Sequence, residues 1–274
     1  MTHGLKSVIR IKMLFSIITI VYNGEALIGG TMQSVVNQTF TDYEYIIVDG
    51  NSKDKTFAIV QDFQKKHTPE ASGQTLSIKA ISEPDKGLYD AMNKGLSRAR
   101  GEFVLFLNAG DHLFEPTTLE KLANAASPTT DVLFGETMLV DARRAHIGTR
   151  TALTVQKLPY RLTWQSLRFG MVVCHQSFLI RRKLAPQYIE QNLAADIDWV
   201  IKCLKKSKNQ TNTHIIISEY LMGGVSKTQH RQSLKDRYAV LKTHFGWLPN
   251  LLNHGVIAVR ALIFKWRNKN KPTY

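Results

Sequence analysis

Residues 101–111 read Gly-Glu-Phe-Val-Leu-Phe-Leu-Asn-Ala-Gly-Asp, an unbroken apolar run from Phe103 to Leu107 that ends in a small polar turn and an acid. An apolar run without alternation is typical of a strand buried on both faces in the middle of a parallel sheet. A carboxylate at the end of such a strand is costly to leave without a partner. We therefore expect Asp111 to hold either a cation or the N-terminus of a helix beginning near Pro116.

Upstream of this stretch, short apolar runs alternate with segments of helical period, which is the pattern of a mostly parallel α/β sheet. In the segment that precedes residue 101, Leu88, Met92 and Ala99 are expected to face inward, with Gly101 as the C-terminal cap of their helix. The strands expected in this half span residues 15–21, 45–48, 76–81 and 103–107, and helices follow the first three of them.

Downstream of residue 111 the pattern is less regular. Helical period and apolar runs still alternate there, but an irregular basic stretch interrupts them. The helices expected in this half span residues 116–126, 196–205, 229–245 and 251–266, the strands span 132–140, 177–180 and 214–218, and the irregular stretch is 143–157.

The composition excludes several classes of protein. With 43% hydrophobic and 21% charged residues the chain is ordinary for a globular protein, and no stretch reaches the roughly 18 to 20 apolar residues that span a bilayer. The apolar run from Leu14 to Val21 is followed by a polar turn instead of a cleavage site, so we expect no signal peptide. Two cysteines without metal-binding spacing fit a reducing compartment, and we expect the cytoplasm.

Charge is the most unusual bulk property, with a formal net value of +14. From Leu221 to the C-terminus there are ten Lys and Arg residues against the single acid Asp236, a balance of +9. Such a segment fits nucleic acid, an anionic membrane surface or an anionic substrate. Residues 251–274 mix apolar side chains with cations, which fits a helix lying on a membrane surface, and also a terminal helix packed on the domain.

Polar residues follow three of the predicted strands, at 19–23, at Asp49 and Gly50, and at 108–111. In parallel α/β sheets, ligands bind beyond the carboxyl ends of the strands. Asp49 could accept hydrogen bonds from a ribose or a base while Gly50 lets the backbone approach, but Asp-Gly-Asn-Ser is also a good turn by itself. The turn at 22–25 lacks the glycine-rich loop of a dinucleotide-binding dehydrogenase or of a sugar-nucleotide pyrophosphorylase.

Four blocks in register carry a family resemblance: Ser16-Ile-Ile-Thr-Ile-Val-Tyr-Asn23, Val48-Asp-Gly-Asn-Ser-Lys-Asp54, Asp85-Lys-Gly-Leu-Tyr-Asp-Ala-Met-Asn93 and residues 101–111. Over residues 14–230 their order resembles the family 2 glycosyltransferases with a GT-A fold, of the bacterial polysaccharide type similar to colanic acid glycosyltransferases. This implies an α/β fold with a Rossmann-like nucleotide-binding half, a mostly parallel central sheet flanked by helices, an acceptor-side half and C-terminal helices.

The resemblance also implies a division of the chain. It gives an N-terminal extension (1–13), a nucleotide-sugar-binding half (14–115), an acceptor-binding and catalytic half (116–228) and a basic helical segment (229–274) that is a candidate for membrane contact.

The donor side of the implied site includes a divalent cation, Mg²⁺ or Mn²⁺, held by Asp111. The family's usual upstream acids are replaced here by Asn108 and Gly110, so one carboxylate would anchor the metal. The residues implied to bind the nucleotide-sugar are Thr19, Tyr22, Asn23, Asp49, Ser52, Asp85, Lys86, Asn108 and Gly110.

The acceptor side is implied by the segments 175–182 and 194–199. The resemblance matches Asp196 to the catalytic base, with Asp198 as a rival, and the alternative is that Asp196 only caps the helix running to residue 205. His175 and Trp199 are implied to bind the acceptor sugar, with core packing as the alternative. His230 and Arg231, in the loop 223–231, are candidates to contact the diphosphate, unless that loop is an ordinary Gly-Gly turn.

The implied reaction is an inverting transfer from a nucleoside-diphosphate sugar, expected to be a UDP-sugar, to a hydroxyl of a glycan or lipid-linked oligosaccharide in bacterial surface polysaccharide synthesis. The base takes the proton of the acceptor hydroxyl as its oxygen attacks the anomeric carbon. The place expected for it is the cytoplasm, at the inner face of the plasma membrane. The alternatives are a protein that binds sugar nucleotides or nucleic acid without transferase activity, although no nucleic-acid recognition motif accompanies the basic segment.

Overall fold

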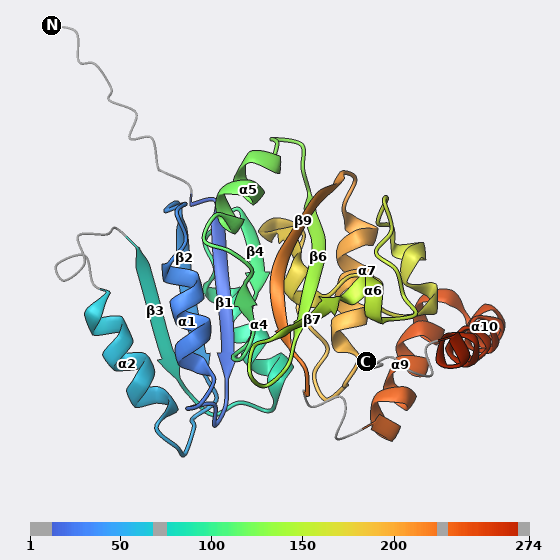
Figure 1. Ribbon diagram of the computed structural model, residues 1–274, viewed down its shortest axis with the longest axis horizontal. Helices are drawn as coiled ribbons and strands as arrows, with labels where there is room; N and C mark the ends of the chain where they lie inside the picture. Colours follow the sequence, from blue (N-terminus) through green and yellow to red (C-terminus); the bar gives the residue numbers. More distant parts are fainter. Residues whose placement is uncertain (1–12, 68–75, 224–229, 268–274) are drawn as a thin grey trace, which may run out of the picture.

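Strand β1 (Phe15–Val21) lies inside the sheet, and all of its residues are buried. In the computed structural model, which describes residues 13–67, 76–223 and 230–267, β1 pairs in parallel with β2 (Tyr43–Asp49) and with β4 (Phe103–Phe106). Figure 1 shows these strands side by side in the left half of the molecule. The apolar run at 103–107 is therefore a central strand, as predicted, because helices cover both faces of the sheet around it.

The described strands form one mixed sheet in the order β3-β2-β1-β4-β8-β6-β9-β5, with β7 paired to β6. β8 is antiparallel to both β4 and β6 and so joins the parallel half to the second half without a break. β6 and β9 are parallel to each other. The other strands are β3 (Ser77–Ser82), β5 (His112–Leu113), β6 (Val132–Val140), β7 (His146–Thr149), β8 (Phe178–Arg181) and β9 (Gln210–Leu221).

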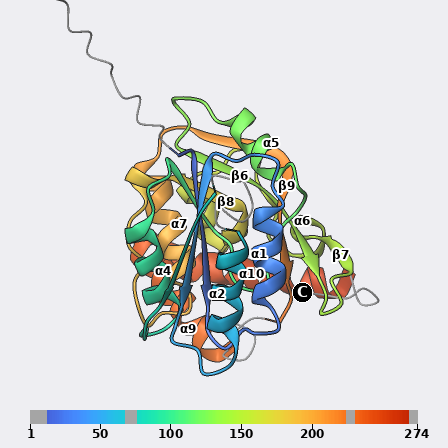
Figure 2. The same ribbon diagram turned by 90° about the vertical axis from the view of Figure 1, so that its left-hand side faces the viewer.

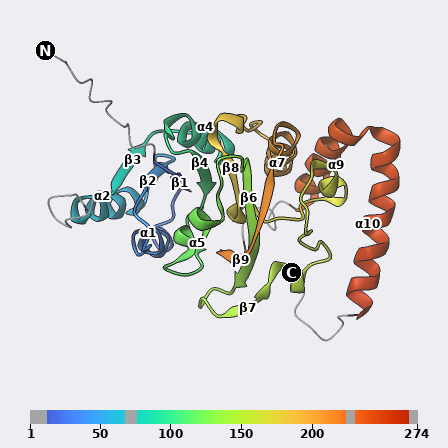
Figure 3. The same cartoon turned by 90° about the horizontal axis from the view of Figure 1, so that it is seen from above.

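Helices cover the two faces of this sheet and divide the apolar core in two. Figures 2 and 3 show α4 (Leu88–Arg98) and α7 (Ala195–Lys206) on one face, and α1 (Ile28–Val36) and α5 (Thr118–Ala125) on the other. The predicted α/β class is confirmed. The other helices are α2 (Thr56–Lys66), α6 (Arg150–Leu153), α9 (His230–Phe245), α10 (Trp247–Arg267) and the 3₁₀ turns η1 (Trp164–Phe169), η2 (His175–Ser177) and η3 (Arg182–Leu184).

Helix α4 differs from the sequence prediction in two details. It ends at Arg98, after which the backbone is already extended, so Gly101 is not its cap. A Cβ atom at Gly101 would lie 2.5 Å from the backbone nitrogen of Ser16, so the glycine is needed because β1 passes directly against it. Leu88 is 42% exposed in the first turn of the helix and does not face inward, whereas Met92 is buried as predicted.

Helix α10 lies at the flank of the acceptor-side half, away from the sheet (Figure 3). It packs on α9 and η1. Among the residues that the structure describes, no helix combines the length and the apolar character that crossing a membrane requires.

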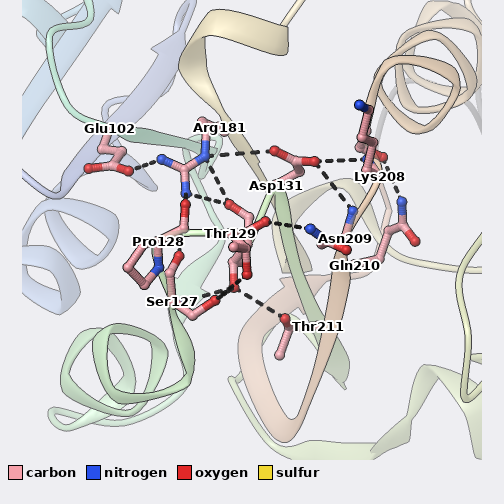
Figure 4. A network of polar contacts seen from close by, with 12 residues as sticks. Glu102, Ser127, Pro128, Thr129, Asp131, Arg181, Lys208, Asn209, Gln210 and Thr211 are labelled. Carbon is pink, nitrogen blue, oxygen red and sulfur yellow. Dashed lines mark hydrogen bonds and ion pairs between the residues drawn. The ribbon is translucent and has the colours of Figure 1, made fainter.

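Arg181 ties together the edge of the sheet at which β4, β6 and β9 begin (Figure 4). Arg181 is 8% exposed, and its guanidinium pairs with Glu102. The guanidinium also donates from Nε to the carbonyl oxygen of Thr130 (2.9 Å) and from Nη2 to that of Pro128 (3.1 Å). It also lies 4.9 Å from the centroid of the Phe103 ring. Because parallel strands begin at this edge and end at the other, this network holds the sheet from the side opposite to the expected ligand site.

We expect Arg181→Ala to lower the free energy of unfolding by about 3–5 kcal/mol, because removal of one partner leaves a partly buried carboxylate and several carbonyl groups without their donor. Chemical denaturation of the purified chain measures this. Lys65→Ala removes one side of the exposed pair Lys65–Asp62 (3.7 Å) and should change the free energy of unfolding by less than about 1 kcal/mol. Equal losses in the two variants would contradict the role given to Arg181.

Candidate active site

The loops that follow β1 and β2 are joined by hydrogen bonds at the carboxyl edge of the sheet. The backbone N–H of Asn23 donates to Oγ of Ser52 (2.8 Å), and Oδ1 of Asn23 accepts from the backbone N–H of Lys53 (2.8 Å). Asn23 has a φ of 48°, in the left-handed region that asparagine tolerates better than most residues. The neighbouring Tyr22 is 59% exposed. The structure thus brings Tyr22, Asn23 and Ser52 together where the sequence predicted donor-binding residues.

Two of the predicted pocket residues lie inside the fold. The carboxylate of Asp49 is fully buried and accepts from the backbone N–H of Ser52 (3.1 Å) and from Oγ of Ser82 (2.6 Å), as the turn alternative described. The hydroxyl of Thr19 is also fully buried and donates to the carbonyl oxygen of Leu107 (2.7 Å). Thr19 therefore ties β1 to the end of β4 and does not line a pocket, contrary to the prediction. Asp49 holds the loops that form the edge.

Asp85 and Tyr22 close over the backbone of Gly50. A Cβ atom at Gly50 would lie 2.3 Å from Oδ2 of Asp85 and 3.3 Å from Cδ2 of Tyr22, so only glycine lets that carboxylate approach. Oδ1 of Asp85 accepts from the backbone N–H of Gly87 (2.9 Å), which fixes the loop before α4. Lys86 between them is exposed. Asp85 and Lys86 therefore lie at the same edge as Tyr22.

The carboxylate of Asp111 connects the two halves of the chain. Its Oδ1 accepts from the backbone N–H of Leu221 (3.0 Å), and its Oδ2 accepts from Nε2 of Gln176 (2.8 Å). Asp111 is 4% exposed, and this burial raises its pKa to about 7, although both hydrogen bonds and the charge of Arg144 act in the opposite direction. Gly110 has a φ of 99°, and its carbonyl oxygen accepts from Nη1 of Arg144 (2.6 Å). Three separate elements thus fix this loop.

The surroundings of Asp111 fit a divalent cation that takes most of its ligands from the substrate. Thr117 occupies the N-cap position of α5, so Asp111 does not cap that helix. Each oxygen of Asp111 accepts one hydrogen bond and keeps a free lone pair, and the buried Oδ1 of Asn108 has no hydrogen-bond partner among the described residues. The same residues contain no group of three or more His, Cys, Asp or Glu side chains placed to hold a metal. One carboxylate with phosphate and water oxygens is nevertheless a common magnesium site.

Asp196 lies in the first turn of α7 and is half-buried. The N-cap position is Ala194, whose methyl group cannot accept a hydrogen bond, and Oδ1 of Asp196 accepts from the backbone N–H of Ile197 (2.8 Å). Burial among its neighbours raises the pKa of Asp196 to about 6, with the charges of Arg237 and Arg150 acting against that rise. Asp196 is therefore a half-buried acid in the first turn of α7 whose pKa lies above its usual value.

Asp198 has a different environment, at the interface of α7 with α9. Its Oδ1 accepts from Nε2 of His244 (2.8 Å), and its Oδ2 is paired with Nζ of Lys202 (2.8 Å). These two partners hold the pKa of Asp198 below its usual value although burial opposes them, and the residue is only 4% exposed. The carboxylate of Asp198 is thus engaged in fastening α9 to α7.

The two predicted acceptor-binding residues belong to the core. Trp199 is fully buried, stacks on Tyr188 with ring centroids 4.7 Å apart, and donates from Nε1 to the carbonyl oxygen of Pro186 (2.7 Å). No face of its indole is open to a sugar, so the stacking role predicted for Trp199 is wrong and the packing alternative holds. His175 is 6% exposed, and Nε2 lies 2.5 Å from the Tyr188 hydroxyl; burial lowers the pKa of this histidine to about 4.

The loop predicted to contact the diphosphate falls mostly outside the described residues. This applies to 224–229 and to the side chain of His230. Arg231 lies in the first turn of α9 and is exposed.

The structure adds side chains that the sequence had not singled out. Arg150 and Arg237 both lower the pKa of Asp196 through their charge. Burial and the charge of Asp196 raise the pKa of Tyr89, which lies near the start of α4, so the Tyr89 hydroxyl is close to Asp196. The stretch 143–157, expected to be irregular, forms β7 and α6, and Arg150 begins α6. Its basic character was a signal, but sequence spacing could not show which of its cations reaches the site.

Comparison with known proteins assigns this arrangement to a family. The sequence profile described as Glycosyl transferase family 2 matches residues 16–188, which include all four sequence blocks and the loops of the carboxyl edge. The chain belongs to glycosyl transferase family 2. The resemblance seen in the sequence is confirmed, and the protein is a glycosyltransferase.

This family 2 glycosyltransferase is 28% identical over 261 residues to a PGL/p-HBAD biosynthesis glycosyltransferase of Mycobacterium tuberculosis, an alignment that covers 92% of this chain and 91% of the relative. The crystal structure of S. aureus TarS in complex with UDP-GlcNAc matches with a TM-score of 0.64 at 21% identity, over 91% of this chain and 67% of that one. The mannosyltransferase PcManGT from Pyrobaculum calidifontis, in complex with GDP-Man and Mn²⁺, matches with a TM-score of 0.60 at 16% identity, over 90% and 73%. These likenesses confirm the predicted GT-A fold.

Ionisation of Asp196 and of Asp198, both in the first turn of α7, is expected to change the stability of the fold in opposite directions. The pKa of Asp196 is raised in the folded state, so its ionisation removes stability as the pH rises from about 4 to about 6. Asp196→Asn stays neutral and should therefore unfold at a higher temperature than the parent chain at pH 8, with little difference at pH 4. Differential scanning fluorimetry across this range measures the effect.

Asp198→Asn is the matched control. The pKa of Asp198 is lowered in the folded state, so its ionisation adds stability above the unfolded pKa, and the asparagine variant should melt at a lower temperature at pH 8. A decrease of similar size in both variants would contradict the environments described here.

Proposed function

We propose that this glycosyltransferase moves a sugar, with inversion at the anomeric carbon, from a nucleoside-diphosphate sugar to a hydroxyl of a glycan or lipid-linked acceptor, and that Asp196 is the base. The observation that carries this proposal is the contrast within α7. The carboxylate of Asp198 is paired with His244 and Lys202, whereas Asp196 is half-buried, forms no ion pair with a described residue, and has a pKa raised to about 6. A general base is most effective when its pKa lies near the working pH.

In the proposed reaction, the carboxylate of Asp196 accepts the proton of the acceptor hydroxyl while the hydroxyl oxygen attacks the anomeric carbon. The bond from that carbon to the diphosphate oxygen breaks on the opposite face, and the nucleoside diphosphate leaves with the electron pair. Tyr89 supports this assignment because its hydroxyl lies close to Asp196 and its helix, α4, directly follows the loop of Asp85 and Lys86. The proposed base is thereby near the proposed donor edge.

We propose a UDP-sugar as the donor, bound at the edge formed by Tyr22, Asn23, Ser52, Asp85 and Lys86. Support comes from the hydrogen bonds that hold these loops together and from the UDP-GlcNAc complex of TarS, which has the same fold. Arg231 is the described part of the segment that we propose to contact the diphosphate.

We propose that a divalent cation accompanies the donor, with Asp111 and the carboxamide oxygen of Asn108 as the protein groups that would hold it. Such a cation offsets the negative charge that develops on a leaving diphosphate. The free lone pairs of Asp111 and the buried oxygen of Asn108 support the assignment, as does the Mn²⁺ in the PcManGT complex.

We propose bacterial glycan or glycolipid biosynthesis as the setting of this activity. The Mycobacterium tuberculosis relative, which aligns over nearly the whole chain, is named for PGL/p-HBAD biosynthesis. The UDP-GlcNAc complex of TarS, which has the same fold, supports a nucleotide-sugar donor for this activity.

Asp196→Asn should lower the turnover number by roughly 10²–10⁴-fold, because the proton acceptor is lost while the shape of the side chain is kept. Release of nucleoside diphosphate from UDP-, GDP- and dTDP-sugars, with Mn²⁺ and a crude lipid acceptor extract, measures this. In the parent chain, activity should rise with pH through about 6 and then level off, since Asp196 must be ionised.

Asp198→Asn is again the control and should retain most of the turnover at a temperature where it is folded. Loss of activity in Asp198→Asn alone would make Asp198 the base. No stabilisation or turnover with any of these nucleotide-sugars would contradict the proposed donor class.

We also propose that α10 rests on an anionic membrane surface. The helix packs on the domain through polar residues: Asn250 is fully buried and donates from Nδ2 to the carbonyl oxygen of Tyr238 (3.2 Å), and the ring of His254 lies edge-on to Tyr238. Two large apolar residues of α10, Ile257 and Phe264, are half-buried. The other large apolar residues of the helix are each at least 39% exposed. They are Trp247, Leu248, Leu251, Leu252, Val256, Val259, Leu262, Ile263 and Trp266.

Charge favours a membrane over a second copy of the chain as the partner of this face. The chain carries a formal charge of +14, so two copies would repel each other, whereas anionic lipids attract it. An apolar helix face with tryptophan at both ends and flanking cations is typical of a helix that lies in the plane of a membrane interface.

Leu252→Glu should weaken binding to vesicles of phosphatidylcholine and phosphatidylglycerol roughly tenfold or more, because a leucine side chain that becomes buried in the membrane contributes about 1.5–3 kcal/mol to binding. Leu252 is 66% exposed, so the fold should not change. Vesicle flotation measures the binding. Leu234→Glu, on α9 with 40% exposure, is the matched control and should bind like the parent chain. Equal binding by all three proteins would exclude α10 as the contact.

A further inference from the structure

A cavity of about 520 Å³, broadly open to solvent, lies between α10, η1 and the segment 155–159. This volume is within the range of about 300–1,000 Å³ that is common for small-molecule sites. Apolar side chains form most of its wall, two cations stand among them, and the described lining contains no acid. The lining residues used below are Lys157, Phe169, Val172, Arg260, Ile263 and Phe264.

The cavity is continuous with the exposed apolar face of α10. Ile263 lines the cavity, which is open to solvent, and is 44% exposed. Val259, one turn earlier, and Leu262 continue the same exposed apolar surface without lining the cavity. An apolar chain that leaves a bilayer beside α10 therefore meets apolar side chains all the way into the cavity.

The inner wall of the cavity is connected to the candidate base. The guanidinium of Arg150 donates from Nη1 to the carbonyl oxygen of Val172 (3.1 Å) and to that of Gln156 (3.3 Å), and both of these residues line the cavity. The same guanidinium acts on the carboxylate of Asp196 through its charge. Arg150 thus hydrogen-bonds to the cavity wall and also acts on the candidate base through its charge.

The two cations give the cavity a preference for an anionic head group. The guanidinium of Arg260 is held 4.5 Å above the ring of Phe169, which fixes it at the junction of α10 and η1. Lys157 is exposed, and its Nζ donates to the carbonyl oxygen of Thr151. A phosphate group on an apolar chain matches this combination of one apolar volume with two cations.

We infer that this cavity binds the apolar chain of a phosphate-bearing lipid acceptor, with the phosphate between Lys157 and Arg260 and the part of the acceptor to be glycosylated directed toward Asp196. The inference rests on the proposed transferase function and names the class of its acceptor. It accounts for a cavity that the donor side does not use, and for the outward apolar face of α10 beside it.

Calorimetric titration of the full chain with dodecyl phosphate, below the concentration at which it forms micelles, tests this inference. Ile263→Glu places a carboxylate at the cavity and should weaken binding of dodecyl phosphate at least about tenfold. Val259→Glu is the matched control, because it puts the same acid on the same helix face outside the cavity, and it should bind dodecyl phosphate like the parent chain. Both variants should lose vesicle binding to a similar extent.

Two further measurements distinguish the contribution of the dodecyl chain to binding from that of the phosphate group. Arg260→Gln should weaken dodecyl phosphate up to about fivefold and leave dodecyl maltoside unchanged. Inorganic phosphate alone should bind much more weakly than dodecyl phosphate, because it lacks the chain. Equal loss in the Ile263 and Val259 variants, or equal binding of dodecyl phosphate and inorganic phosphate, would overturn the inference.

The donor side gives an independent readout. Thermal stabilisation by UDP-sugars and Mn²⁺ should be the same in the parent chain and in Ile263→Glu. Stabilisation by the donor without any binding of dodecyl phosphate would refute the cavity assignment and leave the transferase proposal standing, whereas the reverse result would refute the proposed donor.

Discussion

The candidate site depends on the hydrogen bonds that the carboxylate of Asp111 accepts from two distant segments of the chain. The carboxylate takes one hydrogen bond from the backbone of Leu221 at the end of β9 and one from Gln176 in η2, while its own loop follows β4. Elements more than a hundred residues apart therefore meet at one buried acid. Because two N–H groups point at it and it is almost completely buried, its position is fixed before any ligand arrives.

Burial also sets the pKa values of the two acids in the candidate site. Asp111 and Asp196 both have raised pKa values because burial outweighs the hydrogen bonds and the arginines around them, Arg144 in one case and Arg150 with Arg237 in the other. Neither carboxylate forms an ion pair with a residue that the structure describes, which suits a group that exchanges a proton or meets a cation. The strong pairs of the fold lie elsewhere, such as Arg181 with Glu102 at the opposite edge of the sheet.

The regions proposed to bind the donor and the lipid lie in different parts of the molecule. The loops proposed to bind the donor lie at the carboxyl ends of β1 and β2, whereas α10 and the cavity beneath it lie at the flank of the second half of the chain (Figure 3). Asn250 packs α10 on the domain, and most of the large apolar residues of the helix are exposed. Arg150 hydrogen-bonds to the cavity wall and acts on Asp196 through its charge, which relates the proposed lipid site to the proposed base.

The ends of β1 and β6 follow from the sequence alone and agree with the prediction, as does the family, because four motif blocks occur in one order. These signals are local, so neighbouring residues suffice to produce them. The tertiary structure was needed to show that Thr19 and Trp199 are internal, that Asp198 has two charged partners on its carboxylate, and that the charge of Arg150 acts on Asp196. Burial and charge at a side chain depend on residues far away in the chain, and no spacing within the sequence specifies which of them will meet.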